Sequence, residues 1–193
     1  MENNKFKDGS FQQRKKDVLR KNDKSGIGSW DEKILELCEK INSLDNYYTT
    51  SSCSGRAIFF RNVKRDKRDV TLKRYHEVFL FEELKRDLIE LSKKEKEVNF
   101  KFESCIIHIA CKNVESMKLI FEKAKLAGWK NIGAISFKER FILDLRSTEK
   151  IEFPILGGGE IIVDDDFLKI IVKEANEKLR IGWEKIKRLE KNV

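Results

Sequence analysis

Apolar residues recur at helical spacing in several parts of the chain. The spacing i, i+3, i+4, i+7 predicts a helix over 29–44, a second over about 114–127, and a weaker one over 82–91. A further, long helix is expected after the acidic residues 164–166. Its apolar stripe continues to Leu189, and carboxylates suit a helix N-terminus. These segments account for much of the expected core.

Between the helices lie shorter segments that alternate or run apolar. They predict strands at 47–51, 56–61, 69–75, 100–111, 132–138, 140–146 and 151–155. The segment 100–111 is expected to be one long strand that becomes buried on both faces. Tight connections favour antiparallel pairing, so the expected class is α+β, with mixed, largely antiparallel sheets and helices. Residues 29–61 and 114–146 share the order helix, strand, tight turn, strand, which indicates a duplicated unit.

Composition adds the expectation of a polyanionic partner. Of the 193 residues, 41 are Lys or Arg and 33 are Asp or Glu, a formal net charge of +8. Residues 61–74 hold seven basic and two acidic residues and predict a basic hairpin. Residues 1–20 form a basic N-terminal segment before a single expected domain at 21–193. A nucleic acid is favoured over a membrane surface. With no apolar run long enough to span a bilayer, no secretory signal and four cysteines, we expect a cytoplasmic protein.

The most unusual segment is Thr49-Thr50-Ser51-Ser52-Cys53-Ser54-Gly55-Arg56. Small hydroxyl and thiol side chains are followed by a glycine that permits close backbone approach and by an arginine fork that fits phosphate or carboxylate. The segment therefore predicts an anion-binding turn. The competing interpretation is a Thr/Ser-rich strand that ends in an ordinary turn.

Histidines and cysteines supply the other candidates. His76 follows the basic segment and is the preferred base, whereas His108 stands in an apolar run and is expected to be a buried core residue. The cysteines at 38, 53, 105 and 111 include no C-x-x-C pair, so no metal site is expected. Residues 25–28 follow no strand and give no dinucleotide-binding loop, so a Rossmann fold is not expected.

At these residues the chain resembles the wybutosine-synthesis tRNA methyltransferase family. The similarity extends over about residues 11–190 and includes the opening at 23–31, the signature at 47–56, a K-F-E-x-x-x-x-H-x-x-C strand from Lys101 to Cys111, and the later blocks around Trp129 and Arg146. The chain departs from the family pattern at Tyr75, where a tryptophan is usual, and at Ile132, where a serine is usual.

The resemblance implies a methyltransferase that uses S-adenosyl-L-methionine, with an α+β fold unlike the Rossmann methyltransferases. It implies methylation of N4 of the tricyclic wybutosine-type guanosine derivative at position 37 in the anticodon loop of tRNA(Phe). His76 is the expected base, with Ser52 or Asp23 as alternatives. The expected cofactor-binding residues are Ser51, Ser52, Cys53, Ser54, Gly55, Arg56, Arg146 and Ser147. The expected RNA-binding residues are Arg61, Lys64, Arg65, Lys67, Arg68 and Tyr75.

Two other functions are compatible with the same residues. In a non-catalytic RNA-binding module the hydroxyl segment would contact only phosphate, and RNA affinity would fall steeply with salt. In a thiol hydrolase Cys53 would be the nucleophile beside a histidine, and its replacement would abolish activity.

Overall fold

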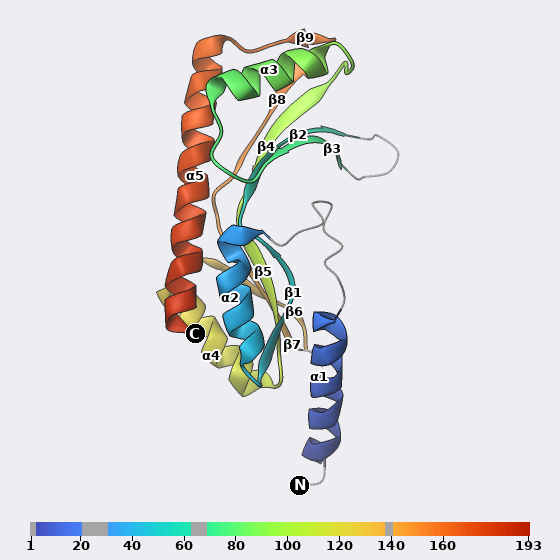
Figure 1. Ribbon diagram of the computed structural model, residues 1–193, viewed down its shortest axis with the longest axis vertical. Helices are drawn as coiled ribbons and strands as arrows, with labels where there is room; N and C mark the ends of the chain where they lie inside the picture. The colour runs from blue at the N-terminus through green and yellow to red at the C-terminus, as the bar shows by residue number, and fades with distance from the viewer. Residues whose placement is uncertain (1–2, 21–30, 63–68, 138–140) are drawn as a thin grey trace. The chain divides into compact units, whose positions relative to one another are not determined.

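A computed structural model describes residues 3–20, 31–62, 69–137 and 141–193 (Figure 1). Over these residues the helices are α1 (Asn3–Leu19), α2 (Glu32–Ser43), α3 (Phe81–Ser92), α4 (Val114–Leu126) and α5 (Asp165–Asn192). The strands are β1 (Tyr47–Cys53), β2 (Arg56–Asn62), β3 (Asp69–Tyr75), β4 (Val98–Glu103), β5 (Ile106–Cys111), β6 (Asn131–Ser136), β7 (Phe141–Arg146), β8 (Ile151–Gly157) and β9 (Glu160–Ile161). Every helix of this described part of the chain is too short or too polar to cross a lipid bilayer.

The described strands form two sheets, and every strand pair is antiparallel. Sheet A has the order β1-β5-β7-β6, and sheet B has the order β3-β2-β4-β8-β9. The predicted α+β class with antiparallel sheets is therefore confirmed. The ends of the basic segment 61–74 lie on two paired strands, because β2 and β3 are antiparallel neighbours.

Each sheet belongs to its own compact unit of the chain. Unit 1 comprises residues up to Ser54, 106–148 and 183–193, and contains sheet A; unit 2 comprises 55–105 and 149–182, and contains sheet B. The proposed repeat does not extend to strand pairing. The strands β1 and β2 join different sheets, whereas β6 and β7 pair with each other.

The prediction of one long strand over 100–111 is wrong. Its first half is β4 in sheet B and its second half is β5 in sheet A, with Ser104 and Cys105 outside both strands. The thiol of Cys105 lies 3.8 Å from the carbonyl oxygen of Gly182, so the break is itself packed. Each half alternates between more and less buried positions, which suits a strand with one face in a core.

In unit 1 the core lies between one face of sheet A and two amphipathic helices. The fully buried residues Ile34, Leu37 and Ile41 occupy the predicted stripe of α2, and Met117 and Ile120 of α4 are also buried. The helix α2 begins at Glu32 with Asp31 as its N-cap, and the predicted cap at Ser29 lies outside the described residues.

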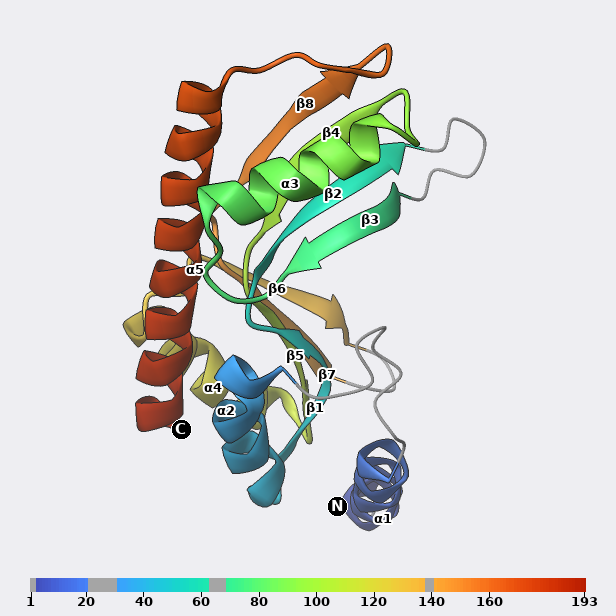
Figure 2. The same ribbon diagram turned by 45° about the horizontal axis from the view of Figure 1, so that its top comes forward.

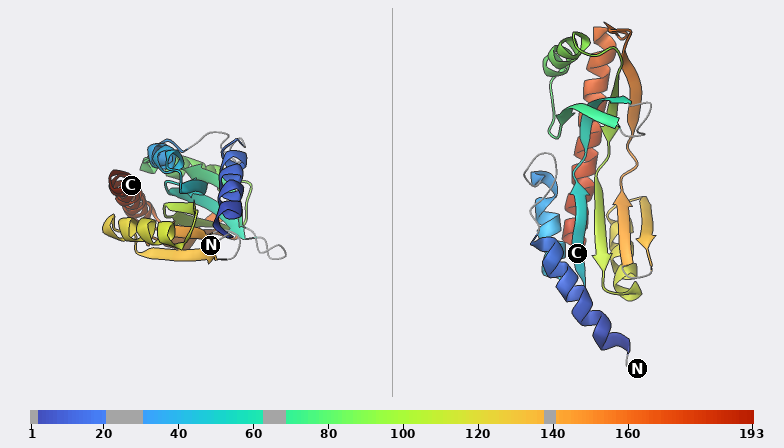
Figure 3. Two further views of the ribbon diagram at one scale, coloured as in Figure 1. Left: turned by 90° about the horizontal axis from the view of Figure 1, so that it is seen from below. Right: turned by 90° about the vertical axis from the view of Figure 1, so that its right-hand side faces the viewer.

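The other face of sheet A carries α1, a helix that the sequence pattern did not predict. The ring of Phe11 on α1 packs 5.2 Å from the ring of Tyr48 on β1, and Lys15 donates a 2.6 Å hydrogen bond to the carbonyl of Leu44. Figure 3 shows α1 on the opposite side of sheet A from α2 and α4. The segment was missed because its few apolar residues form no helical stripe.

In unit 2 the core is rich in aromatic rings. Phe100 on β4 lies 5.8 Å from Phe59 and 5.5 Å from Phe153, while Tyr75 stacks on Phe79 at 4.6 Å. Such pairs stabilise a core beyond the apolar area they bury. Figure 2 shows α3 lying across sheet B, and the hydroxyl of Tyr75 donates a 2.8 Å hydrogen bond to Asp87 of that helix.

Candidate functional site

The hydroxyl-rich segment is mostly strand, not turn. The strand β1 continues to Cys53, and only Ser54 and Gly55 separate it from β2. Gly55 has a φ of +104°, and a Cβ there would lie 3.4 Å from both the Cys105 nitrogen and the Glu103 oxygen. A glycine is therefore favoured at this bend for its backbone conformation.

Because successive residues of a strand point to opposite faces, the hydroxyl and thiol groups are divided between two environments. Ser51 pairs with His108, and Cys53 pairs with Ile106, so these four share one face of sheet A. Ser52 pairs with Ile107 and lies on the face covered by α2. There its side chain hydrogen-bonds the Cys38 thiol, whose pKa burial nonetheless raises to about 11.

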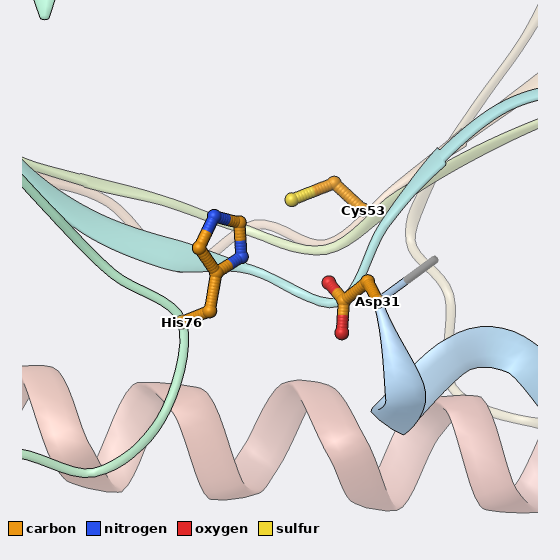
Figure 4. Close-up of side chains that lie close together, drawn as sticks. All are labelled: Asp31, Cys53 and His76. Atoms are coloured by element: carbon orange, nitrogen blue, oxygen red, sulfur yellow. The ribbon is translucent and has the colours of Figure 1, made fainter. Parts of the chain in front are cut away.

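The end of β1 is attached to the start of α2 by one carboxylate. Asp31 Oδ1 accepts a 3.3 Å hydrogen bond from the Lys33 backbone nitrogen, and Oδ2 accepts a 2.7 Å bond from the Ser54 nitrogen. Figure 4 shows Asp31 at the beginning of α2 and Cys53 near the end of β1. A helix N-terminus favours such a charge, so Asp31 both caps the helix and positions the strand end.

A row of four residues crosses sheet A on the face opposite the core. We call Ser51, His108, Asp144 and Gly133 the polar row, because their Cα atoms pair in this order across β1, β5, β7 and β6. Ser51 and Gly133 are exposed, and the side chains of His108 and Asp144 are 23% and 18% exposed. A Cβ built on Gly133 meets no atom within 4 Å. The polar row therefore lies on an accessible part of the sheet.

The centre of the polar row is a charge-bearing cluster. The imidazole Nε2 of His108 lies 3.2 Å from Asp144 Oδ1, and the guanidinium Nε of Arg146 donates a 2.7 Å hydrogen bond to Asp144 Oδ2. Both carboxylate oxygens thus face a nitrogen. The histidine expected in the core instead stands on the accessible face beside two charged residues.

Sequence reasoning missed this cluster, although two signals were available. His108 and Asp144 are each the only ionisable residue inside an apolar strand segment, at Ile106–Ala110 and Ile142–Leu145. A polar residue at such a position is consistent with a strand whose second face is not part of the core.

Unit 2 contains the expected anion-binding arginine of the hydroxyl segment. Arg56 Nε donates a 2.7 Å hydrogen bond to Glu103 Oε2, and the Arg56 side chain is 31% exposed. Lys101 lies 3.5 Å from the other oxygen of Glu103. Arg61 contacts Glu95 at 3.0 Å and keeps a side chain that is 48% exposed. Both arginines are accessible to solvent, and each already forms an ion pair with one carboxylate.

The preferred base and its aromatic neighbour also belong to unit 2. His76 follows β3 and is labelled in Figure 4; both of its ring nitrogens are enclosed. Tyr75 is only 5% exposed. Burial and the hydrogen bond to Asp87 both raise the pKa of Tyr75 above its ordinary value. With its ring stacked on Phe79, Tyr75 has no free face in this structure for a nucleobase.

The remaining expected residues divide between buried and undescribed positions. Ser147 is 5% exposed, and its hydroxyl accepts a 2.6 Å hydrogen bond from the buried amine of Lys185. Ser54 is fully buried. Asp23, Lys64, Arg65, Lys67 and Arg68 lie outside the described residues.

Comparison with known proteins places this chain in a family. The family model described as methyltransferase TYW3 matches residues 13–193. A relative from Methanocaldococcus jannaschii, named tRNA(Phe) 7-((3-amino-3-carboxypropyl)-4-demethylwyosine(37)-N(4))-methyltransferase, is 40% identical over 79% of this chain and 80% of its own length. A tRNA wybutosine-synthesizing protein 3 homolog from Danio rerio is 36% identical over 93% of this chain and 72% of its own.

A solved structure shows the same fold. The PH1069 protein from Pyrococcus horikoshii is similar with a TM-score of 0.83 and 32% sequence identity, over 95% of this chain and 96% of that one.

Proposed function

The chain belongs to the methyltransferase TYW3 family, and from that premise we propose that it methylates N4 of the demethylwyosine derivative at position 37 of tRNA(Phe). The observation that carries the proposal is the family match over residues 13–193, together with a relative of that named activity at 40% identity. A cytoplasmic location belongs to the same proposal.

We propose S-adenosyl-L-methionine as the methyl donor, whose sulfonium supplies the methyl group. The residues present fit its amino-acid end. Arg56 and Arg146 are each oriented by a single carboxylate through Nε. Within the described part of the chain, no further hydrogen bond occupies their terminal nitrogens, so each fork can accept a carboxylate. Ser51 and Cys53 add small polar groups on the accessible face of sheet A.

The proposed RNA contact uses the basic hairpin. Arg61, Lys64, Arg65, Lys67 and Arg68 would bind the phosphates of the anticodon loop, which is single-stranded and open to such contacts. The exposed side chain of Arg61 supports this role. His76, Ser52 and Asp23 remain the proposed catalytic residues from the sequence.

The test is incubation of the purified protein with S-adenosyl-L-methionine and tRNA from a strain that lacks this gene. Mass spectrometry of nucleoside 37 should show the gain of one CH₂ group, in a reaction that also yields S-adenosylhomocysteine. Titration calorimetry with the donor distinguishes the alternative of a non-catalytic RNA-binding module, which would bind tRNA but not the donor.

A double variant sharpens the assignment of the cofactor site. Replacing Arg56 and Arg146 by alanine should weaken donor binding, because the carboxylate of the donor loses whichever of the two alternative guanidiniums binds it. The exposed surface variant Lys94→Ala, which breaks only a pair with Glu90, is the control. Equal affinities of both proteins would exclude the two arginines from the site.

A further inference from the structure

The strand β1 contains a β-bulge inside the hydroxyl segment. Thr49 pairs with Ile109 on β5. The next pair in the register joins Ser51 to His108, so Thr50 is left without a partner on β5. The neighbours on β5 are consecutive residues, whereas those on β1 are two residues apart. One extra residue in one strand of an antiparallel pair defines a bulge, and bulges re-aim the side chains that follow them.

The bulge decides which side chains of the segment face the accessible side of sheet A. In an unbroken strand Thr49, Ser51 and Cys53 would share one face, since side chains alternate with a period of two. Here Thr49 is 5% exposed, whereas Ser51 is exposed on the opposite face. The side chains of Thr49 and Ser52 both hydrogen-bond the Cys38 thiol on α2, so these two lie on the same side although they are three residues apart.

The side chain of Asn42, in the last turn of α2, holds the residue before the bulge. Its Oδ1 accepts a 2.7 Å hydrogen bond from the backbone nitrogen of Thr49. The Thr49 hydroxyl lies 3.2 Å from Oδ1 and 3.1 Å from Nδ2 of the same amide. A bulge interrupts the ladder locally, so a buried backbone nitrogen beside it is satisfied by a group outside the ladder. Asn42 supplies that group.

The same helix holds the other end of the segment. Asp31, the N-cap of α2, accepts the 2.7 Å hydrogen bond from the Ser54 nitrogen. From Asp31 to Asn42 a helix advances about 16 Å. An extended strand covers about the same length from Thr49 to Ser54. The helix α2 therefore fits the segment as a support with one anchor at each end.

The start of β1 cannot exchange its two faces. On one side the hydroxyl of Tyr47 donates a 2.9 Å hydrogen bond to the carbonyl of Ser116 on α4. On the other side Tyr48 is fully buried, and its ring packs against that of Phe11. If the bulge were lost, residues 51–53 would therefore be the ones to change face.

We propose that Asn42 is a positioning residue of the donor site: it holds the β-bulge that presents Ser51 and Cys53 on the accessible face of sheet A. The inference rests on the proposed function and deepens it, because it names the residue that orients the segment expected to bind the donor. Asn42 acts through the backbone of Thr49.

The first experiment reads the two faces of β1 without donor or RNA. Iodoacetamide labelling of Cys53 probes the accessible face. A thiol introduced by Ser52→Cys, in a chain where Cys53→Ser removes the native one, probes the side of α2. With Asn42 in place, Cys53 should react faster than the introduced thiol. The opposite order would overturn the proposal before Asn42 is altered.

The variant Asn42→Ala should then shrink or reverse the difference between the two probes, because the nitrogen beside the bulge loses its partner. A general loss of stability would instead speed the labelling of both probes together. That outcome, or an unchanged difference, would overturn the proposal. If Asn42→Ala does not fold, Asn42→Gln makes the same test, since it keeps an amide but displaces it by one methylene.

The second experiment measures donor affinity by titration calorimetry. Asn42→Ala should weaken binding by about ten-fold or more, since it turns away two groups where Ser51→Ala removes one. Asn42→Asp is the conservative variant. Its carboxylate still accepts hydrogen bonds from the nitrogen and hydroxyl of Thr49, so the labelling order should be kept and affinity should stay within about two-fold. Loss of both in Asn42→Asp would contradict the proposed role.

Asn113 provides a matched control in the same unit. Its Oδ1 accepts a 2.8 Å hydrogen bond from the nitrogen and a 2.7 Å bond from the hydroxyl of Ser116, the same two kinds of donor that Asn42 holds. Asn113→Ala should lower stability as the loss of a helix cap does, without changing the labelling order or donor affinity. Circular dichroism melts compare the stabilities of the variants.

The remaining outcomes separate this inference from the proposed function. If Asn42→Ala changes the labelling order but not donor affinity, the inference is wrong, and the donor binds away from the segment. If the unaltered protein shows the expected labelling order but binds no donor and methylates no tRNA, the proposed function itself fails.

Discussion

The two faces of sheet A are made by the same strands and have opposite properties. One face packs Ile107 and Leu145, both fully buried, against the helices of unit 1. The other face presents His108 and Asp144, one residue along in each strand, with about a fifth of each side chain exposed. The alternation of a strand thus produces a core and a polar surface from one short segment.

The comparison of the two faces shows which one contributes to stability and which one can hold polar groups. On the covered face a side chain is surrounded by apolar neighbours, and its loss leaves a cavity. On the accessible face side chains contribute little to the core, so polar and charged groups can be kept there at low cost to folding. Substitutions on adjacent residues should therefore have separate effects, and five experiments test this separation.

The largest effect is expected for Ile107→Ala. Removing this fully buried side chain from the central strand should lower the free energy of unfolding by about 2–5 kcal/mol. Its neighbour Ile106→Ala makes a related truncation on the accessible face and should cost about 1 kcal/mol or less. Urea unfolding followed by circular dichroism measures both. Equal losses would mean that the accessible face is also packed.

Thiol reactivity gives the next largest difference. Burial raises the pKa of Cys38 to about 11 and that of Cys111 to about 12, and both lie toward the covered face. At pH 8 the thiolate fraction of Cys38 is about 0.001, so iodoacetamide should modify Cys53 first. Peptide mass spectrometry reads the order of labelling, and unfolded protein, in which all thiols are open, is the control.

The same raised pKa values predict how stability depends on pH. In the unfolded chain these thiols ionise near their ordinary pKa, below the folded values of about 11 and 12. The stabilisation by the neutral thiols is therefore complete below about pH 8.5 and is lost as pH rises toward 11. Replacing Cys38 by serine should reduce this alkaline loss, as urea melts across pH would show.

Two glycine substitutions should lower the free energy of unfolding less than Ile107→Ala does. They test the backbone instead of the side chains. Gly55→Ala should destabilise by about 1–3 kcal/mol, because the φ of +104° strains an L-residue and its Cβ would press on two backbone atoms. Gly133→Ala should leave stability unchanged or raise it slightly, since its Cβ meets open space. A destabilised Gly133→Ala would show that the accessible face is closed at that point.

The smallest effect separates the two neighbouring serines. Ser51→Ala on the accessible face should weaken donor binding by about five-fold, the equivalent of one hydrogen bond of about 1 kcal/mol. Ser52→Ala lies on the side of α2 and should change donor affinity less. Calorimetry on both variants measures the difference. If Ser52→Ala weakened donor binding more than Ser51→Ala, the donor would be assigned to the face of sheet A that α2 covers.

Much of the architecture followed from local pattern. The apolar stripes of α2 and α4 were visible as helical spacing, and the strand at 69–75 was predicted with its observed limits. The family resemblance was carried by motifs such as the hydroxyl segment, and the family match confirms it. These features depend on residues that are near each other in the chain, so the order of amino acids determines them directly.

Long-range pairing decided the rest. Nothing local distinguishes the two halves of 100–111, yet one joins sheet B and the other sheet A. Likewise Asp144 is brought beside His108 only by the register of β5 against β7, and Ser51 by that of β1. Strand alternation is a property of sequence, but the neighbours across a sheet depend on packing over the whole unit. That is why the hydroxyl segment was identified from sequence, while the histidine and carboxylate beside it emerged only from the tertiary structure.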